Sequence, residues 1–144
     1  MSIERIACVA SRSPLAQQGL ALIEARESLV PVEEADAIVA LGGDGFMLDC
    51  FHRYLDTGLP IYGMNRGTVG FLMNGFQEQR LLERVQGAES QALFPLRVTA
   101  TDTRGETTSA LAFNEVSLVR YSNQSANLQI SIDGKVRMDK LMSD

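Results

Sequence analysis

ADAIVALGGDG, residues 35–45, places a continuous apolar run directly before two glycines, an aspartate and a third glycine. An apolar run of this length bounded by glycines is typical of a strand that is buried on both faces, as in a parallel sheet. The next segment, DGFMLDCFHRYL (44–55), has its apolar residues spaced for one face of a helix. A strand, a glycine-rich turn and a helix in this order predict an α/β fold. The turn then lies at the carboxyl end of a strand, where such sheets bind ligands.

The rest of the first 92 residues repeats this alternation. Two further buried strands and two amphipathic helices are predicted over 5–10, 60–65, 13–26 and 77–87. Ser13 precedes a proline at the first helical position, which is a common pattern at helix N-termini. Strands that alternate with helices favour parallel pairing, with the helices packed on the sheet. We therefore expect an α/β domain with a parallel sheet and flanking helices over residues 1–92.

After residue 92 the pattern changes to short strands with no helix between them. They are predicted over 95–101, 107–113, 115–120, 127–132 and 135–138. Asp133–Gly134 is a strong signal for a two-residue hairpin turn, so antiparallel pairing is expected. A few strands with one open edge make a poor domain by themselves. Residues 93–144 are therefore predicted to be the start of an all-β domain that is truncated here.

The composition of the 144 residues is that of a globular protein, with 45% hydrophobic residues, 22% charged residues and a formal net charge of −5. This negative surplus argues against non-specific binding to nucleic acid or to an anionic membrane. No apolar stretch reaches the roughly 18 residues of a membrane span, and the N-terminus lacks the pattern of a signal peptide. Cys8 and Cys50 show no metal-binding spacing, so reduced thiols and a cytoplasmic location are expected.

The glycine-rich turn has two interpretations from its residues alone. Gly42 and Gly43 allow positive φ and remove the β-carbons that keep phosphate oxygens away from backbone N–H groups. A helix that begins near Asp44 points its free N–H groups at the same place. A carboxylate there suits proton acceptance from an attacking hydroxyl, as in protein kinases, or it helps to hold a divalent cation. The alternative is that Asp44 only caps its helix; the motifs GxxxxGK[ST] and GxGxxG are both absent.

Three motifs together resemble those of the bacterial NAD kinases, and of their α-proteobacterial branch in particular. They are LGGDGFMLDCFH (41–52), GMNRGTVGFLMN (63–74) and FNEVSLVR (113–120), in this order along the chain. The first motif alone is shared with diacylglycerol kinases, sphingosine kinases and phosphofructokinases. The resemblance implies transfer of a phosphoryl group from ATP, or from polyphosphate in some members, to the 2′-hydroxyl of NAD, which gives NADP.

The resemblance also implies roles for residues of the first two motifs. Asp44 matches the proton acceptor of the family. The three glycines Gly42, Gly43 and Gly45 match the loop that surrounds the phosphates. Phe71 matches an aromatic residue near the adenine, although an ordinary core phenylalanine is the alternative for this position.

Further roles follow from the third motif and the last residue. Asn114 and Glu115 match a pair that contacts the nucleotide, and Asp144 matches an aspartate that reaches the nicotinamide end, often in a neighbouring subunit. Neighbouring residues on a regular strand point to opposite faces. If Asn114 and Glu115 contact one ligand, the backbone at 113–115 must be irregular. Arg66 is interpreted either as a residue lining the cleft or as a solvated one.

The expected partners are therefore NAD and ATP, with a divalent cation, Mg²⁺, between the donor phosphates. The sequence shows no carboxylate cage for the metal, which is expected to be held by ATP and water. The family implies a homodimer or homotetramer for the full-length protein. The 144-residue chain is expected to be inactive alone, because a family member continues with a segment that completes the dinucleotide site. The alternatives are a lipid or sugar kinase with the same GGDG motif, or a non-catalytic nucleotide-binding module.

Overall fold

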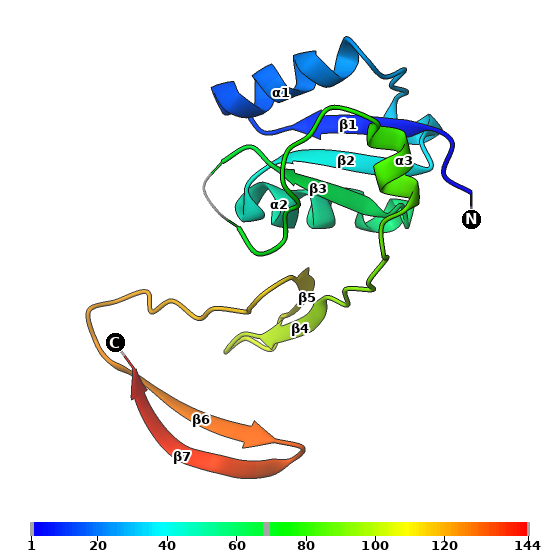
Figure 1. Ribbon diagram of the computed structural model, residues 1–144. Helices are drawn as coiled ribbons and strands as arrows, with labels where there is room; N and C mark the ends of the chain where they lie inside the picture. Colours follow the sequence, from blue (N-terminus) through cyan, green and yellow to red (C-terminus); the bar gives the residue numbers. More distant parts are fainter. Residues whose placement is uncertain (1, 68–69, 144) are drawn as a thin grey trace. The chain divides into compact units, whose positions relative to one another are not determined.

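The computed structural model of the protein describes residues 2–67 and 70–143. The chain divides into two compact units, Met1–Phe113 and Asn114–Asp144. Figure 1 labels the helices and strands of both units. Because the units are separate compact bodies, each has its own packing.

The first unit is built around a parallel three-stranded sheet in the order β1-β2-β3 (Figure 1). The strands are β1 (Ile6–Ala10), β2 (Ala37–Gly42) and β3 (Ile61–Asn65). In the register of the sheet, Val39 of β2 pairs with Cys8 on one side and Tyr62 on the other. All six residues of β2 are buried, whereas β1 and β3 are buried only in part. The predicted parallel α/β sheet is confirmed, with the 35–45 segment as its central strand.

Helices cover both faces of this sheet, and Figure 1 shows α1 and α2 on opposite sides of it. The helical elements are α1 (Pro14–Glu24), α2 (Asp44–Tyr54) and α3 (Leu81–Gln86), with short 3-10 turns η1 (Val32–Glu34) and η2 (Leu55–Thr57). Alternate residues of a strand point to opposite faces. Val39 and Leu41 accordingly belong to a core with residues of α1 and α3, and Ala40 belongs to a second core with Met47 and Cys50 of α2. This two-sided burial explains the continuous apolar run in the sequence.

The sequence predicts the start of α1 correctly and the start of α3 wrongly. α1 begins as expected, and the Ser13 hydroxyl accepts a hydrogen bond from the Ala16 N–H at 3.2 Å. The predicted helix over 77–87 is wrong at its start, because α3 begins only at Leu81. Arg80 has a φ of 51°, a left-handed conformation that a helix cannot include. The Leu81 N–H donates instead to the Glu27 carboxylate at 3.1 Å.

Two antiparallel hairpins follow the parallel sheet. One pairs β4 (Leu96–Thr101) with β5 (Thr107–Ala112), and the other pairs β6 (Ala126–Ile132) with β7 (Lys135–Ser143). At the tip of the second hairpin Asp133 and Gly134 have φ values of 50° and 73°. Positive φ at both central residues is the geometry of the tight turn that the Asp-Gly pair predicts. The expected change from parallel to antiparallel structure is confirmed.

One of the strand predictions in this region is wrong and another is too short. The strand expected over 135–138 forms, but β7 continues to Ser143 and stays paired with β6 beyond the register shifts near Ile130. The strand expected over 115–120 does not form. None of the strand pairings in the described ranges includes these residues. An apolar run needs a hydrogen-bonding neighbour to become a strand. Val119, for example, is 88% exposed.

None of the helices in the described ranges has the length and hydrophobicity to cross a lipid bilayer. Both cysteines are free: Cys50 is on the buried face of α2 and Cys8 is half-buried on β1. The predicted free thiols are therefore confirmed.

The two thiols are expected to be unreactive in the native protein. Burial raises the pKa of Cys8 to about 12, with a further contribution from the charge of Glu24. Burial also raises the pKa of Cys50 to about 11, where the charges of Arg53 and Asp49 act in opposite directions. The thiolate is the reactive form, and both groups stay protonated well below these values. Alkylation with iodoacetamide at about pH 8 should be much slower in the native protein than in denaturant. Equal labelling rates in the two conditions would contradict this packing.

Candidate functional site

The glycine-rich turn lies at the carboxyl end of β2, as the sequence predicts. Gly42 is the last residue of the strand and Asp44 is the first residue of α2, so Gly43 alone makes the connection. Gly43 is extended, with φ of −113° and ψ of −176°. The first N–H groups of α2 therefore point toward the space beyond the strand end, which is favourable for an anion.

The glycines of this turn serve one of the two uses that the sequence suggests. No positive φ is found at Gly42, Gly43 or Gly45, so none of them uses the left-handed conformation that glycine allows. What matters is the space that the missing side chains leave. A β-carbon at Gly42 would approach the Phe46 side chain to 2.7 Å, whereas Gly43 and Gly45 have no heavy atom within 4 Å of that position. Gly42 is therefore needed for packing, and Gly43 and Gly45 leave an open surface beside the helix N-terminus.

The Asp44 carboxylate is bound by a second segment of the chain. One oxygen accepts a hydrogen bond from the Phe71 N–H at 2.8 Å, and the other accepts one from the Leu72 N–H at 3.0 Å. The alternative that Asp44 caps its own helix is wrong, because Gly43 is the cap residue and no side-chain cap bond is made. Each carboxylate oxygen keeps a lone pair for a further donor. The arrangement thus holds a carboxylate in a fixed direction at the strand end.

Gly70 makes this close approach possible. A β-carbon at Gly70 would lie 2.3 Å from an Asp44 carboxylate oxygen, which is less than any real contact. Only glycine allows the backbone to reach Asp44 in this way. Gly70 lies within the second motif of the sequence, but the sequence alone gives no signal for this role.

The carboxyl end of β3 is tied to the same turn. The Arg66 N–H donates to the Gly42 carbonyl at 2.8 Å, and the Asn65 side-chain oxygen accepts from the Gly67 N–H at 2.8 Å. A β-carbon at Gly67 would be 3.8 Å from the Gly43 backbone. The ends of the two strands therefore form one surface, which agrees with the expectation that both motifs lie at strand ends.

The Arg66 side chain turns away from this surface. Its Nε–H donates to the Leu15 carbonyl at 2.9 Å, and its guanidinium lies 4.1 Å from the centre of the Phe76 ring. Both interactions tie α1 to the segment after β3. Neither the cleft-lining nor the solvated interpretation of Arg66 is therefore right. The Arg66 side chain instead connects α1 to the segment after β3.

Phe71 is placed differently from a core residue. Its side chain is 101% exposed, so the alternative of an ordinary core phenylalanine is wrong. Its N–H is one of the two donors to Asp44. An exposed ring directly beside the bound carboxylate is free to stack on a ligand.

The third motif has the irregular backbone that was expected. β5 ends at Ala112, the residues after it are in bends, and Asn114 has a φ of 73°. Asn114 and Glu115 belong to the second unit and are described apart from the glycine-rich turn. Asp144 lies outside the described residues.

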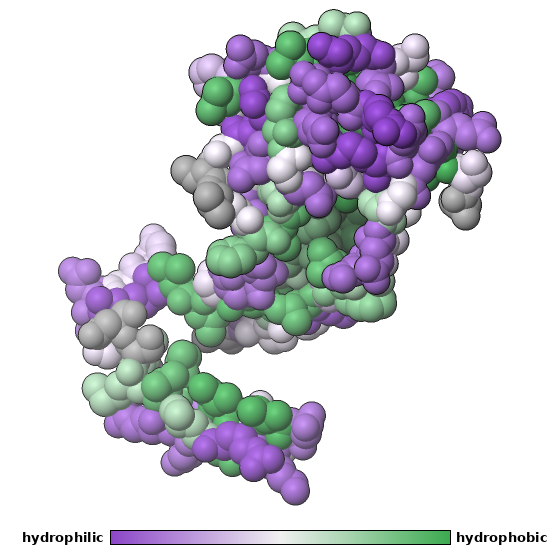
Figure 2. All heavy atoms as spheres, viewed as in Figure 1, coloured by the Kyte–Doolittle hydropathy of each residue, from purple (hydrophilic) through white to green (hydrophobic). Residues whose placement is uncertain are grey.

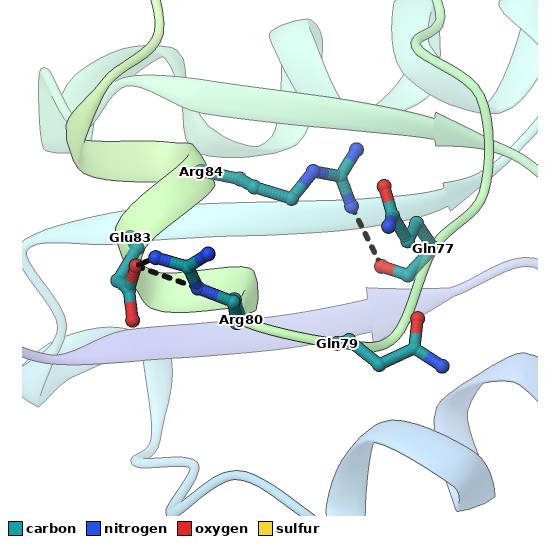
Figure 3. A pocket seen from close by; sticks show the side chains of 5 residues that line it. All are labelled: Gln77, Gln79, Arg80, Glu83 and Arg84. Atoms are coloured by element: carbon teal, nitrogen blue, oxygen red, sulfur yellow. Dashed lines mark hydrogen bonds and ion pairs between the residues drawn. The ribbon is translucent and has the colours of Figure 1, made fainter.

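A pocket of about 450 Å³ lies beside α3 (Figure 3), and it is lined by Gln77, Gln79, Arg80, Glu83 and Arg84. Figure 3 shows that the guanidinium groups of Arg80 and Arg84 both interact with other residues of the pocket. Arg80 forms an ion pair with Glu83, and Arg84 donates to the Gln77 carbonyl at 2.7 Å. Because these charges are already paired, the pocket is a weaker candidate for an anionic ligand than the strand-end surface.

A metal site made by the protein alone requires several ligand side chains close together. In the part of the chain that the structure describes, no three His, Cys, Asp or Glu side chains come together to hold a metal ion. The donor set at the glycine-rich turn is the single carboxylate of Asp44. The described residues therefore do not fit a metal bound by the protein alone.

The fold and the site define the chain as an α/β protein with a GGDG turn and a bound aspartate at a strand end. The family model of the ATP-NAD kinase N-terminal domain matches residues 9–86. A NAD kinase of Cereibacter sphaeroides is 54% identical over all 144 residues, which cover 57% of that relative. NAD kinases of Hyphomonas neptunium and Caulobacter vibrioides are 52% and 51% identical over 97% and 99% of this chain, and 55% of each relative is covered.

The chain belongs to the NAD kinase family, and the resemblance stated from the three motifs is confirmed. It spans somewhat more than half the length of the curated relatives that it matches.

Replacement of Gly70 tests whether the carboxylate contact is as close as described. In Gly70→Ala, the new methyl group must displace Asp44 or the Phe71–Leu72 backbone, and the free energy of unfolding should fall by about 1–3 kcal/mol, as in other overpacked sites. The Phe71 and Leu72 amide protons should move upfield in NMR spectra, because they lose a charged acceptor. The matched control is Gly75→Ala, where no heavy atom lies within 4 Å of the new carbon. Equal behaviour of the two variants would exclude the contact.

Proposed function

We propose that the protein containing this chain transfers a phosphoryl group from ATP to the 2′-hydroxyl of NAD and so forms NADP. The observation that carries the proposal is the Asp44 carboxylate, which two backbone N–H groups hold at the open carboxyl end of β2. Family membership and the names of the relatives support the same reaction.

Asp44 is proposed as the proton acceptor. A carboxylate is a weak base for an alcohol, but it takes the proton late, as the hydroxyl oxygen bonds to phosphorus. The Phe71 and Leu72 N–H groups fix its direction, so less reorganisation is needed at the moment of transfer. The proton then moves from the 2′-oxygen to a free lone pair of the carboxylate, and the bond between the γ-phosphorus and the leaving oxygen breaks.

The other site residues are proposed to bind the nucleotides. Gly43 and Gly45, with Gly42 behind them, leave room for phosphate oxygens at the N-terminus of α2. Phe71 offers its exposed ring to the adenine.

Three further residues have proposed roles in dinucleotide binding that follow from the family resemblance. Asn114 and Glu115 are proposed to contact the nucleotide, and Asp144 to approach the nicotinamide end. The irregular backbone around Asn114 supports the first of these roles, because it frees neighbouring side chains from pointing to opposite faces.

The divalent cation is proposed to arrive with ATP. Since the described residues do not fit a protein-made metal site, no step of the mechanism is assigned to a bound metal. When Mg²⁺ is present with ATP, its chemistry is to neutralise charge on the phosphates.

The proposed protein is larger than the chain. We propose an α/β domain over 1–92 and a β domain that begins at 93, in a cytoplasmic homodimer or homotetramer. Figure 2 shows a hydrophobic side on the β6–β7 hairpin, where Ile130, paired with Met138, is 37% exposed and Met138 is 43% exposed. Further β-structure over this side would bury it, and the greater length of the relatives supports this. The isolated chain is therefore proposed to be inactive.

The acceptor can be tested directly in the protein carried to the length of its relatives. Purified protein with ATP and Mg²⁺ is offered NAD, diacylglycerol, sphingosine or a sugar phosphate, and the phosphorylated product is identified by mass spectrometry. We expect NADP only, and no turnover by the isolated 144-residue chain as the matched control. Phosphorylation of a lipid or sugar in place of NAD would support the other GGDG kinases. Saturable NAD binding without any product would support a non-catalytic module.

A further inference from the structure

The segment that carries the Phe71 and Leu72 N–H groups is fastened to β3 immediately after them. Asn74 forms an isolated parallel bridge with Met64. Its N–H donates to the Gly63 carbonyl at 2.9 Å, and its carbonyl accepts from the Asn65 N–H at 2.8 Å. The backbone at Asn74 is thus a short extension of the sheet beside β3.

Two side chains strengthen this attachment, and both use Gly63. The Asn74 side-chain amide donates to the Gly63 carbonyl at 3.1 Å, so this carbonyl accepts two hydrogen bonds from one residue. The Met73 sulfur lies where a side chain on Gly63 would begin, 2.5 Å from the position of a β-carbon there. Met73 also packs against the core that contains Met47 and Cys50. One polar and one apolar contact therefore meet at the same glycine.

The attachment controls the position of the donors through the chain itself. Leu72 is next to Met73, and consecutive Cα atoms are a fixed 3.8 Å apart. The Leu72 carbonyl also comes close to Gly63, at 3.2 Å from the β-carbon position. Release of Met73 and Asn74 would leave the two N–H groups without this attachment to β3, and their acceptor, the Asp44 carboxylate, is half-buried and accessible to water.

We propose that Met73 and Asn74 are positioning residues, which anchor on Gly63 and thereby hold the Phe71 and Leu72 N–H groups against the Asp44 carboxylate. The consequence for turnover rests on the proposed function of Asp44. The anchoring itself does not, because it depends only on the hydrogen bonds of Asn74 and the packing of Met73 at Gly63.

The test uses amide hydrogen exchange, measured by NMR, and turnover in the protein carried to the length of its relatives. In Asn74→Ala, which removes the side-chain hydrogen bond to Gly63, exchange at the Phe71 and Leu72 amides should become faster by about tenfold, the size expected for loss of one hydrogen bond. In Met73→Ala, which removes the packing over Gly63, exchange at the same amides should become faster by about tenfold or more. The β2 amides at Val39 and Leu41 should keep their protection. NADP formation at saturating substrates should fall by a similar factor.

Three controls separate positioning from general loss of structure. Gly75→Ala, in the same segment but with open space around it, should match the parent protein in exchange and turnover. Met73→Leu restores an apolar side chain over Gly63 and should recover most of both quantities. Asp44→Asn tests the proposed function separately.

The outcomes are distinguishable. Unchanged exchange at Phe71 and Leu72 in both alanine variants overturns the anchoring, whatever the activity of Asp44→Asn. Faster exchange without a loss of turnover overturns the positioning role. If Asp44→Asn itself remains active, the proposed role of Asp44 fails, and the exchange rates still decide whether the anchor exists.

Discussion

β2 is buried on both faces, and the geometry of the site depends on that burial. Helices pack on each side of the sheet, so the strand can present nothing to solvent except its carboxyl end. The chain leaves this end through a single residue, Gly43, and enters α2 at Asp44. The position of the carboxylate is therefore fixed by the core rather than by a flexible loop. Loss of core packing under β2 would move the site as well as destabilise the fold.

The second element of the site comes from the end of β3. Because β2 and β3 are parallel neighbours, their carboxyl ends lie together, and the Arg66 N–H joins them through the Gly42 carbonyl. The segment after β3 then returns along the sheet, with Phe71 and Leu72 directed at Asp44. Glycines at 63 and 70 are necessary for this path, since side chains there would collide with Met73 and with Asp44. The glycines of the motif over 63–74 are therefore explained largely by groups that approach the backbone closely.

Much of the fold could be predicted from the sequence, because local signals and tertiary structure agree. Apolar runs marked the three parallel strands, Ser13 marked the start of α1, and the Asp-Gly pair marked the last hairpin. The predictions failed where a distant or absent neighbour decides the outcome. Arg80 interrupts a helical pattern with a left-handed conformation that composition does not reveal. Residues 115–120 have the apolar pattern of a strand but no strand to pair with in the described ranges.

The site was predicted in part for the same reason. The location of Asp44 at a strand end followed from the order of strand, glycines and helix. Its hydrogen-bond donors did not follow, because they are backbone groups 27 and 28 residues further along the chain, and every residue except proline has such a group. The glycines of the turn allow both a positive φ and a close approach of other groups, and only the second property is used, because none of the three has a positive φ. Only coordinates distinguish these two uses.

The proposed role of Asp44 as proton acceptor is tested most directly in the Asp44→Asn variant of the protein carried to the length of its relatives. Its NADP formation is measured together with its NAD binding by calorimetry. Asparagine keeps the size of the side chain and one acceptor oxygen, but it cannot take a proton from the 2′-hydroxyl. If Asp44 is the proton acceptor, turnover falls by about 10²–10⁴-fold, the usual contribution of a positioned base, while the affinity for NAD changes little. Turnover within a few-fold of the parent protein would contradict this role.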